Sequence, residues 1–451
     1  MKNDHTYRSL LRIGLPILAS LCVSQIQMIT DQAFLGHASP EYLTAVGNAG
    51  YTIWTTISFL FALGTGTAIL VSQKLGEKRH DQAEEIAGST FVYSSFFAII
   101  VFFVWFFGSR RIFTAMGLKD PILSHAALYA KVVTAGIVLT GFTSASNAIY
   151  NGTGYTRPLM ITSILRAVIN IALDWLLIFG NLGFPRLGIL GAAVATLVAD
   201  IVGSGYSISR AFSRSLPLRM SFRAIRRANL RNYLSVIKVG IPASLEEFSW
   251  NAGNILLIRF LNQVDAMAAG IYTIIMAVTL IPALIFTAVG NAAMTLSGRR
   301  TGEGRPEEIS RTGKAALTMS AFVAVAFALA FTFAPNVFVG LFTKDEGIMS
   351  QTGKLMLISS INLFPRAANI IYGGNIRGMG DTRWMLGTQA FGTAFVVLSA
   401  WLLIFRFEFG ITGLFLAVFL DETVRAFLNG YRFYSSVRRR VREIEVTRGA
   451  A

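Results

Sequence analysis

Seven acidic residues lie inside long apolar stretches of this chain, and they are its main candidates for chemistry. They are Asp31, Asp174, Asp200, Glu246, Glu247, Asp421 and Glu422. A carboxylate in an apolar medium loses its hydration, so carboxylates in such stretches usually bind a proton, an ion or a basic side chain. The four histidines are scattered, Cys22 is the only cysteine, and no phosphate-binding or serine-hydrolase motif occurs. The carboxylates therefore favour ion or proton binding over catalysis, and a membrane-embedded enzyme is the weakest alternative.

Two helical spacings in the first half of the chain bring oxygen-bearing side chains together. Asn170 and Asp174 are four residues apart, as are Thr196 and Asp200, so each pair shares one face of a helix. Together with Asp31, these side chains offer oxygen ligands for a small hard cation such as Na⁺, or a hydrogen-bonded relay for a proton. Hydrogen bonds that only hold helices together are the alternative, which we favour for Asp200.

In the second half, two adjacent carboxylates follow a proline. Glu246 and Glu247 come soon after Pro242, and Glu247 shares a helical stripe with Asn251 and Asn254. Neighbouring side chains of a helix point in different directions, so we expect at most one of the two carboxylates to face a cavity. We interpret this stripe as a candidate site for substrate or for a relayed proton.

A second carboxylate pair in this half lies close to a basic residue. Asp421 and Glu422 precede Arg425 by four and three residues, which are the spacings of ion pairs along one helix. We therefore expect these two carboxylates to be neutralised inside the protein rather than to bind an ion.

The stretches that carry these residues are long enough to cross a membrane as helices. Hydrophobic residues make up 53% of the chain and charged residues 14%, whereas soluble domains have about 25% charged residues. A helix needs roughly 20 apolar residues to span a bilayer, and the long runs lack the alternation of membrane strands. We predict an all-α integral membrane protein with twelve transmembrane helices, over residues 10–35, 47–73, 88–108, 124–150, 158–180, 188–209, 236–259, 266–296, 315–334, 350–376, 384–405 and 410–431.

The chain is also a tandem repeat with a spacing of 226 residues. The segment Asn151–Arg157 returns as Arg377–Arg383, with two glycines and the final Thr-Arg retained. Pro16 and Pro242 are equivalent at the same spacing, and we regard them as candidate hinges because proline removes a backbone hydrogen bond from a helix. Each half holds six spans and so enters the membrane in the same orientation, an arrangement typical of transporters.

Charge predicts the orientation and the division of the chain. Most of the 40 Lys and Arg residues fall in the N-terminus, the even-numbered loops and the C-terminal tail, so both termini are expected in the cytoplasm. The basic linker is either an amphipathic segment on the membrane surface or a solvated connector, and its arginines favour lipid headgroups over nucleic acid. The predicted parts are an N-lobe at 1–212, the linker at 213–234, a C-lobe at 235–434 and a basic cytoplasmic tail at 435–451.

Several motifs resemble those of one known family, and the resemblance covers nearly the whole chain. They are Gly14-Leu15-Pro16, Thr30–Gly36 around Asp31, Asn151–Gly154, Arg377–Thr382, Asn170 with Asp174, and Gly191–Thr196. In these motifs the chain is similar to the multidrug and toxic compound extrusion (MATE) transporters, and to their DinF-like bacterial branch.

The resemblance implies two six-helix bundles, related by a pseudo-two-fold axis, in a V shape. It also implies a secondary antiporter in the bacterial cytoplasmic (inner) membrane, which exports organic cations and other amphipathic drugs by alternating access in exchange for H⁺ or Na⁺. Such a protein needs no cofactor besides the coupling ion. We expect a monomer that contacts membrane lipids and binds no nucleic acid.

The resemblance also assigns roles to residues of the first half. The family's ion-coupling cluster falls on Asp31, Asn170, Asp174 and Thr196, which would also be the ligands of Na⁺ if that is the coupling ion. Two further polar positions of the same lobe match Tyr129 and Asn147.

The second half departs from the family pattern. Arg366 stands where another branch carries an acidic residue on the tenth span, and Glu246 and Glu247 sit about one turn too early on the seventh. The resemblance therefore favours ion coupling in the first half. Arg166 and Arg366 also support an alternative function, a flippase for a lipid-linked precursor, because a pyrophosphate needs cations in the cavity that holds it.

Overall fold

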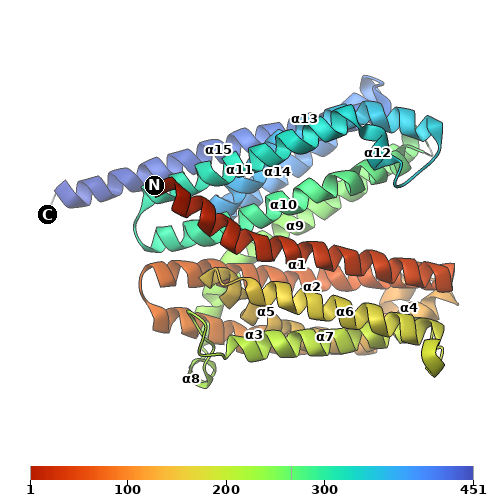
Figure 1. Ribbon diagram of the computed structural model, residues 1–451, viewed down its shortest axis with the longest axis horizontal. Coiled ribbons are helices and arrows are strands. Elements are labelled where there is room, and N and C mark those ends of the chain that lie inside the picture. The colour runs from red at the N-terminus through yellow and green to blue at the C-terminus, as the bar shows by residue number, and fades with distance from the viewer. Residues whose placement is uncertain (1, 266, 450–451) are drawn as a thin grey trace. The chain divides into compact units, whose positions relative to one another are not determined.

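The computed structural model describes residues 2–265 and 267–449, which are almost entirely helical and contain no strand (Figure 1). Residues 1, 266, 450 and 451, which belong to the predicted N-lobe, the span 266–296 and the tail, lie outside the described residues. The long helices are α1 (Lys2–Ala38), α2 (Pro40–Gly76), α3 (His80–Ala115), α5 (Ile137–Thr153), α6 (Arg157–Phe179), α7 (Ile189–Ala211), α9 (Leu230–Val264), α10 (Ala268–Gly302), α11 (Pro306–Phe333), α13 (Glu346–Gly378), α14 (Thr382–Trp401) and α15 (Gly410–Gly449). The shorter elements are α4 (Ile122–Val133), α8 (Phe222–Arg226), α12 (Pro335–Val339), η1 (Thr134–Gly136), η2 (Asn181–Gly183) and η3 (Leu402–Arg406).

Each predicted span corresponds to one long helix, and the span at 124–150 corresponds to α4, η1 and α5 in succession. Among the described residues, ten of these helical stretches are long and apolar enough to cross a membrane. The other two, α9 and α15, are equally long but carry charged residues near their middle, such as Glu246 in α9 and Asp421 in α15. The twelve long helices confirm the predicted all-α fold.

The breaks between helices have local causes in the sequence. Ser39 is extended between α1 and α2, its hydroxyl accepts the backbone N–H of Glu41 at 3.2 Å, and Pro40 follows as the first helical residue. Gly154 ends α5 with a φ of +75°, and its repeat equivalent Gly380 follows α13 with a φ of +91°. Only glycine adopts this left-handed conformation without strain, so the repeated motif forms the same turn in both halves.

The chain divides into two compact units. We call them the N-terminal unit, Leu15–Ser244, and the C-terminal unit, Met1–Gly14 with Leu245–Ala451. Within each unit the long helices run side by side (Figure 1). The division falls inside α1 and inside α9, so it lies beyond the linker that we predicted at 213–234.

Close glycine contacts explain why α1 and α9 each contribute to both units. A Cβ atom on Gly14 would lie 3.5 Å from the carbonyl oxygen of Ala288 in the C-terminal unit. A Cβ atom on Gly240 would lie 2.9 Å from the carbonyl oxygen of Ala62 in the N-terminal unit. Both glycines and both alanines are separated by the repeat spacing of 226, so the two helices pack by the same contact in each unit.

A second pair of contacts shows that the repeat extends to helix crossings. A Cβ atom on Gly64 in α2 would lie 2.6 Å from the hydroxyl oxygen of Ser144 in α5. Gly290 in α10 and Ile370 in α13 are their equivalents at the spacing of 226. A Cβ atom on Gly290 would lie 3.0 Å from the Cγ2 atom of Ile370. A side chain at either crossing would crowd the facing helix, so glycine fits both positions best.

The basic linker is a folded part of the N-terminal unit. Leu216, Leu218 and Met220 alternate with exposed residues and are buried, and the backbone N–H of Met220 donates to the carbonyl of Ala211 at 2.8 Å. Ala224 of α8 packs against Gly88 of α3, at one end of the unit (Figure 1). The segment is therefore packed onto the helices of this unit, and its place on the membrane surface stays a prediction.

Candidate functional site

Two helices of the N-terminal unit, α1 and α6, carry a ladder of polar contacts. The hydroxyl groups of Ser20 and Ser163 lie 2.6 Å apart, and the Gln27 Nε2 donates to the Asn170 Oδ1 at 2.6 Å. Both pairs are separated by 143 residues, and so are Asp31 and Asp174, which form the next step. Steps of seven and four residues keep these side chains on one face of each helix, as in parallel helix pairs.

The last step of the ladder brings two carboxyl groups together. Asp31 and Asp174 lie beside each other, within reach of a shared proton, and the Asn170 side chain lies next to Asp174. Asn170 and Asp174 are 0% and 1% exposed. Without a proton or cation between them, the Oδ1 atoms of both aspartates have no hydrogen-bond donor among the described residues. Two adjacent carboxylates cannot both remain charged in an apolar medium, so this pair is suited to hold one proton or one small cation.

Tyr129 of α4 and Thr196 of α7 form a separate contact near this pair. Their side chains lie close to each other, and the Thr196 hydroxyl donates to the Ala192 carbonyl at 2.9 Å. The structure places Thr196 beside Tyr129, and its predicted role with Asp31, Asn170 and Asp174 stays a prediction.

Asp200 has a basic partner that the sequence did not indicate. The Arg166 guanidinium forms an ion pair with the Asp200 carboxylate, across α6 and α7. The pair lies at a cavity of about 210 Å³, which Asn147 also lines. A Cβ atom on Gly136 would lie 3.0 Å from the Asp200 carboxylate, so this glycine makes room for the pair. No helical spacing connects residues 34 apart, and Asp200 is a neutralised charge rather than a free carboxylate.

Asn147 is held by a hydrogen bond within the same cavity. The Ser207 Oγ of α7 donates to the Asn147 Oδ1 of α5 at 3.2 Å. The Nδ2 group of Asn147 therefore remains available to donate to a molecule in the cavity.

In the C-terminal unit, Glu246 rather than Glu247 lines a cavity. This cavity has a volume of about 270 Å³, and Glu246 forms an ion pair there with Arg377, whose Nε donates to the Glu246 Oε2 at 3.2 Å. Glu247 is exposed. On the predicted stripe, Asn251 is half-buried, and the Asn254 Oδ1 accepts a hydrogen bond from the Tyr272 hydroxyl at 2.7 Å. Arg377 belongs to the repeated motif, but its partner 131 residues earlier could not be inferred from spacing.

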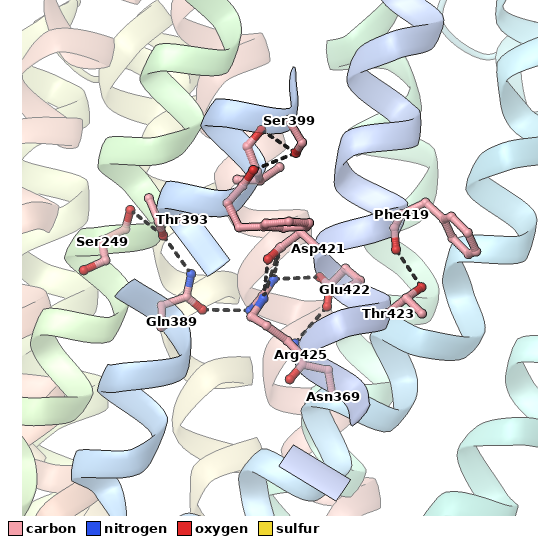
Figure 2. A network of polar contacts seen from close by, with 12 residues as sticks. Ser249, Asn369, Gln389, Thr393, Ser399, Phe419, Asp421, Glu422, Thr423 and Arg425 are labelled. Atoms are coloured by element: carbon pink, nitrogen blue, oxygen red, sulfur yellow. Dashed lines mark hydrogen bonds and ion pairs between the residues drawn. The ribbon is translucent and has the colours of Figure 1, made fainter. Parts of the chain in front are cut away.

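Asp421 and Glu422 both pair with Arg425 inside the protein, as we predicted, and share its single positive charge (Figure 2). The Arg425 Nη2 lies 2.6 Å from the Asp421 Oδ2 and 3.5 Å from the Glu422 Oε1. The Arg425 Nη1 donates to the Gln389 Oε1 at 2.9 Å, and the Asn369 Nδ2 donates to the Glu422 Oε2 at 2.8 Å. Figure 2 shows how this network joins α13, α14 and α15.

Comparison with known proteins agrees with the repeat and the fold. The MatE family model matches residues 16–176 and again residues 242–402, so its two matches are also 226 residues apart. The chain belongs to the MatE family. This is the MATE family that the sequence motifs predicted, a family of multidrug efflux transporters, and the chain is a multi-pass membrane protein. The DinF-like branch remains a prediction.

The MatE-family chain is similar to curated transporters over almost its full length. It is 26% identical to the uncharacterized transporter YisQ of Bacillus subtilis, over 96% of this chain and 95% of that protein. It is 25% identical to the probable multidrug resistance protein NorM of Thermotoga maritima, over 95% of this chain and 92% of that protein. Its fold matches a MATE transporter crystallised in complex with MaL6, with a TM-score of 0.90, 20% identity and 97% of each chain covered.

Proposed function

We propose that this MatE-family transporter exports amphipathic, often cationic drugs in exchange for protons, by alternating access. The observation that carries the proposal is the contact of the half-buried Asp31 with the buried Asp174, whose Oδ1 atoms have no donor in the part of the chain that the structure describes. A proton on this pair neutralises it, and its release leaves two facing negative charges. The repulsion between them is a means of moving α1 relative to α6.

The ligands around the pair favour a proton over Na⁺. Na⁺ requires several oxygen ligands, but the Asn170 Oδ1 already accepts the Gln27 amide at 2.6 Å, which leaves the Asn170 Nδ2 as a donor. We therefore propose H⁺ as the coupling ion and keep Na⁺ as the alternative.

Pro16 and Pro242 are the proposed hinges of this movement. Each follows by two residues the glycine at which α1 or α9 packs on one unit, Gly14 and Gly240. Proline removes a backbone hydrogen bond at this position and lowers the cost of bending. Replacing Pro16 with Ala should slow transport and leave substrate binding intact, as measured by efflux rates and equilibrium binding in the same vesicles.

We also propose that the protein acts as a monomer in the bacterial inner membrane, with both termini in the cytoplasm. The distribution of Lys and Arg supports this orientation. Accessibility of single cysteines placed in the linker and in the loop before α4 to a membrane-impermeant reagent will test it. Labelling of the linker from outside intact cells contradicts the orientation.

Transport in proteoliposomes tests the coupling ion directly. Efflux of a fluorescent organic cation should follow an imposed proton gradient and should not follow an imposed Na⁺ gradient. Efflux driven by the Na⁺ gradient alone would identify Na⁺, and not H⁺, as the coupling ion. Movement of lipid-linked pyrophosphates without response to either gradient would support the flippase alternative. That alternative rests on Arg166 and Arg366, and Asp200 already neutralises Arg166.

A further inference from the structure

The cavity of about 210 Å³ in the N-terminal unit is lined mainly by polar side chains, and all of its lining residues belong to this unit. Those that carry a hydroxyl or an amide group come from α1, α5, α6 and α7 and are Ser20, Thr140, Thr143, Asn147, Thr162, Ser163 and Ser204. Asp31 and Asp174 are not among the described residues that line it. The cavity is therefore a separate site from the proposed proton-binding pair.

The charges that line this cavity cancel. The Arg166 guanidinium and the Asp200 carboxylate form an ion pair, and no other charged side chain of the described chain lines the cavity. A charged molecule would lose its hydration here and would find each protein charge already paired. The cavity therefore favours a molecule without net charge.

Several hydrogen-bonding groups of the wall remain unused. The ion pair joins the Arg166 Nη2 to the Asp200 Oδ1, so the other N–H groups of the guanidinium and the Asp200 Oδ2 have no partner in the described part of the chain. The Asn147 Nδ2 donates to no described residue either. The hydroxyl groups of Thr162 and Ser204, which are 6% and 5% exposed, likewise have no hydrogen-bond partner among the described residues.

Other hydroxyl groups of the wall are left as acceptors. The Thr143 Oγ1 donates to the Leu139 carbonyl at 2.8 Å, and the Thr140 Oγ1 donates to the Gly136 carbonyl at 3.4 Å. Each of these oxygens keeps a lone pair for a donor in the cavity. The wall thus offers both donors and acceptors, and a hydroxyl group matches such a wall because it donates and accepts.

Two aromatic rings of α2 form an apolar part of the same wall. The ring centroids of Trp54 and Phe61 lie 5.7 Å apart, and both residues line the cavity. Trp54 is 53% exposed. An apolar group can therefore stack on this ring while the polar side chains bind a hydroxylated part of the same molecule.

We propose that the N-terminal unit binds, in this cavity, a neutral molecule that joins a ring with several hydroxyl groups to an apolar group. The hydroxyl groups bind Asn147 and the pair of Arg166 and Asp200, and the apolar group lies on Trp54. The volume of about 210 Å³ is below the roughly 300 Å³ at which drug-sized pockets begin, so the enclosed part of the molecule is small. This inference concerns binding alone and does not rest on the proposed function.

Calorimetric titration of the purified protein tests the proposal, in a polyoxyethylene detergent because that detergent carries no sugar. The probe is phenyl glucoside. Its primary alcohol is replaced by a carboxylate in phenyl glucuronide and by an amine in the matching amino derivative, and the phenyl ether of tetrahydropyran keeps both rings without the hydroxyl groups. We expect saturable binding of phenyl glucoside and at least about tenfold weaker binding of the other three. Equal affinity for a charged derivative or for the ether overturns the proposal, as does a lack of saturable binding.

Asn147→Leu tests the contact with the amide group. This change keeps the approximate size of the side chain and removes the Nδ2 donor, so it should weaken phenyl glucoside binding about tenfold. The matched control is Asn48→Leu on α2, because the Asn48 Nδ2 donates to the Thr44 carbonyl at 2.9 Å and Asn48 does not line the cavity. Unchanged affinity in Asn147→Leu, or the same loss in the control, contradicts the proposed contact.

Removing one charge at a time gives a result that misfolding cannot imitate. Arg166→Gln leaves the Asp200 carboxylate unpaired and should raise the affinity for the amino derivative. Asp200→Asn leaves the Arg166 guanidinium unpaired and should raise the affinity for phenyl glucuronide. The double variant should again prefer phenyl glucoside. The same order of affinities in all four proteins overturns the proposal that the balanced charges select a neutral ligand.

Binding by Asp31→Asn separates this proposal from the coupling mechanism. That variant should lose gradient-driven efflux and bind phenyl glucoside with unchanged affinity. Loss of both properties in a variant that melts normally contradicts the independence of the two sites.

Discussion

The carboxyl groups of Asp31 on α1 and Asp174 on α6 lie beside each other, although 143 residues separate them in the chain. Gln27 and Asn170, one turn earlier on the same helices, fix the register with a hydrogen bond of 2.6 Å. Both pairs use the i and i+4 positions of their helix. The ladder therefore determines which carboxyl groups meet, and this pair is the proton-binding unit that we propose.

The first prediction concerns this pair. Asp31→Asn and Asp174→Asn should each abolish proton-driven efflux. An amide beside a carboxyl group cannot form the two facing negative charges that release of the proton leaves on the aspartate pair. Substrate binding should remain within about threefold, since neither change alters the aromatic or apolar surfaces. Glu445→Gln, on an exposed part of α15, is the matched control and should transport normally. Full activity of either aspartate variant under a proton gradient would contradict the coupling role.

The second prediction concerns the hydrogen bond that sets the register. Gln27→Ala removes the donor to the buried Asn170 Oδ1, so it should lower the free energy of unfolding by about 1–3 kcal/mol. Ser20→Ala, one step earlier on the same ladder, removes a contact between two hydroxyl groups at a half-buried position and should cost less. Thermal melting of the purified proteins in detergent measures both. Equal melting temperatures for Gln27→Ala and the unchanged protein would show that the ladder does not stabilise this unit.

The third prediction concerns the ion pair between Arg166 and Asp200. Arg166→Gln leaves the Asp200 carboxylate unpaired and should destabilise the protein by about 1–3 kcal/mol. This loss is smaller than the loss from breaking a fully buried ion pair, because the Arg166 side chain is 37% exposed. The double variant Arg166→Gln with Asp200→Asn should recover most of this loss, because it removes both charges. A double-mutant cycle on melting temperatures checks the recovery. Additive losses in the double variant would rule out a direct pair.

The fourth prediction concerns the crossing of α2 and α5. A methyl group on Gly64 would lie 2.6 Å from the Ser144 hydroxyl, so Gly64→Ala should destabilise the N-terminal unit by about 1–3 kcal/mol. Gly47→Ala lies on the same helix with nothing within 4 Å of the added methyl group. That control should be neutral or stabilise by about 0.4–1 kcal/mol, because alanine restricts the unfolded chain. Melting curves that show the same shift for both variants would contradict the close crossing.

The sequence predicted the fold well because its signals are local or periodic. Apolar length predicts the helices, and the spacing of 226 predicts equivalent parts, from the left-handed turns at Gly154 and Gly380 to the glycine crossings at Gly64 and Gly290. The pairing of Asp421 with Arg425 was also predictable, since four residues separate them on one helix. The fold class and the charges within one helix follow from the order of residues along the chain.

The contacts between helices were decided only by the tertiary structure. The sequence could not pair Arg166 with Asp200 or Glu246 with Arg377, because these contacts depend on the rotation and axial shift of whole helices. The sequence indicated Asp31 and Asp174 as candidates, but only packing placed one beside the other and Thr196 next to Tyr129. Electrostatic interactions within an apolar interior depend on a few ångströms, whereas the hydrophobic pattern fixes helices only to within a turn. The sequence by itself thus determined the repeat and the membrane helices, and the packing of those helices determined which charges are neutralised and which remain available to bind.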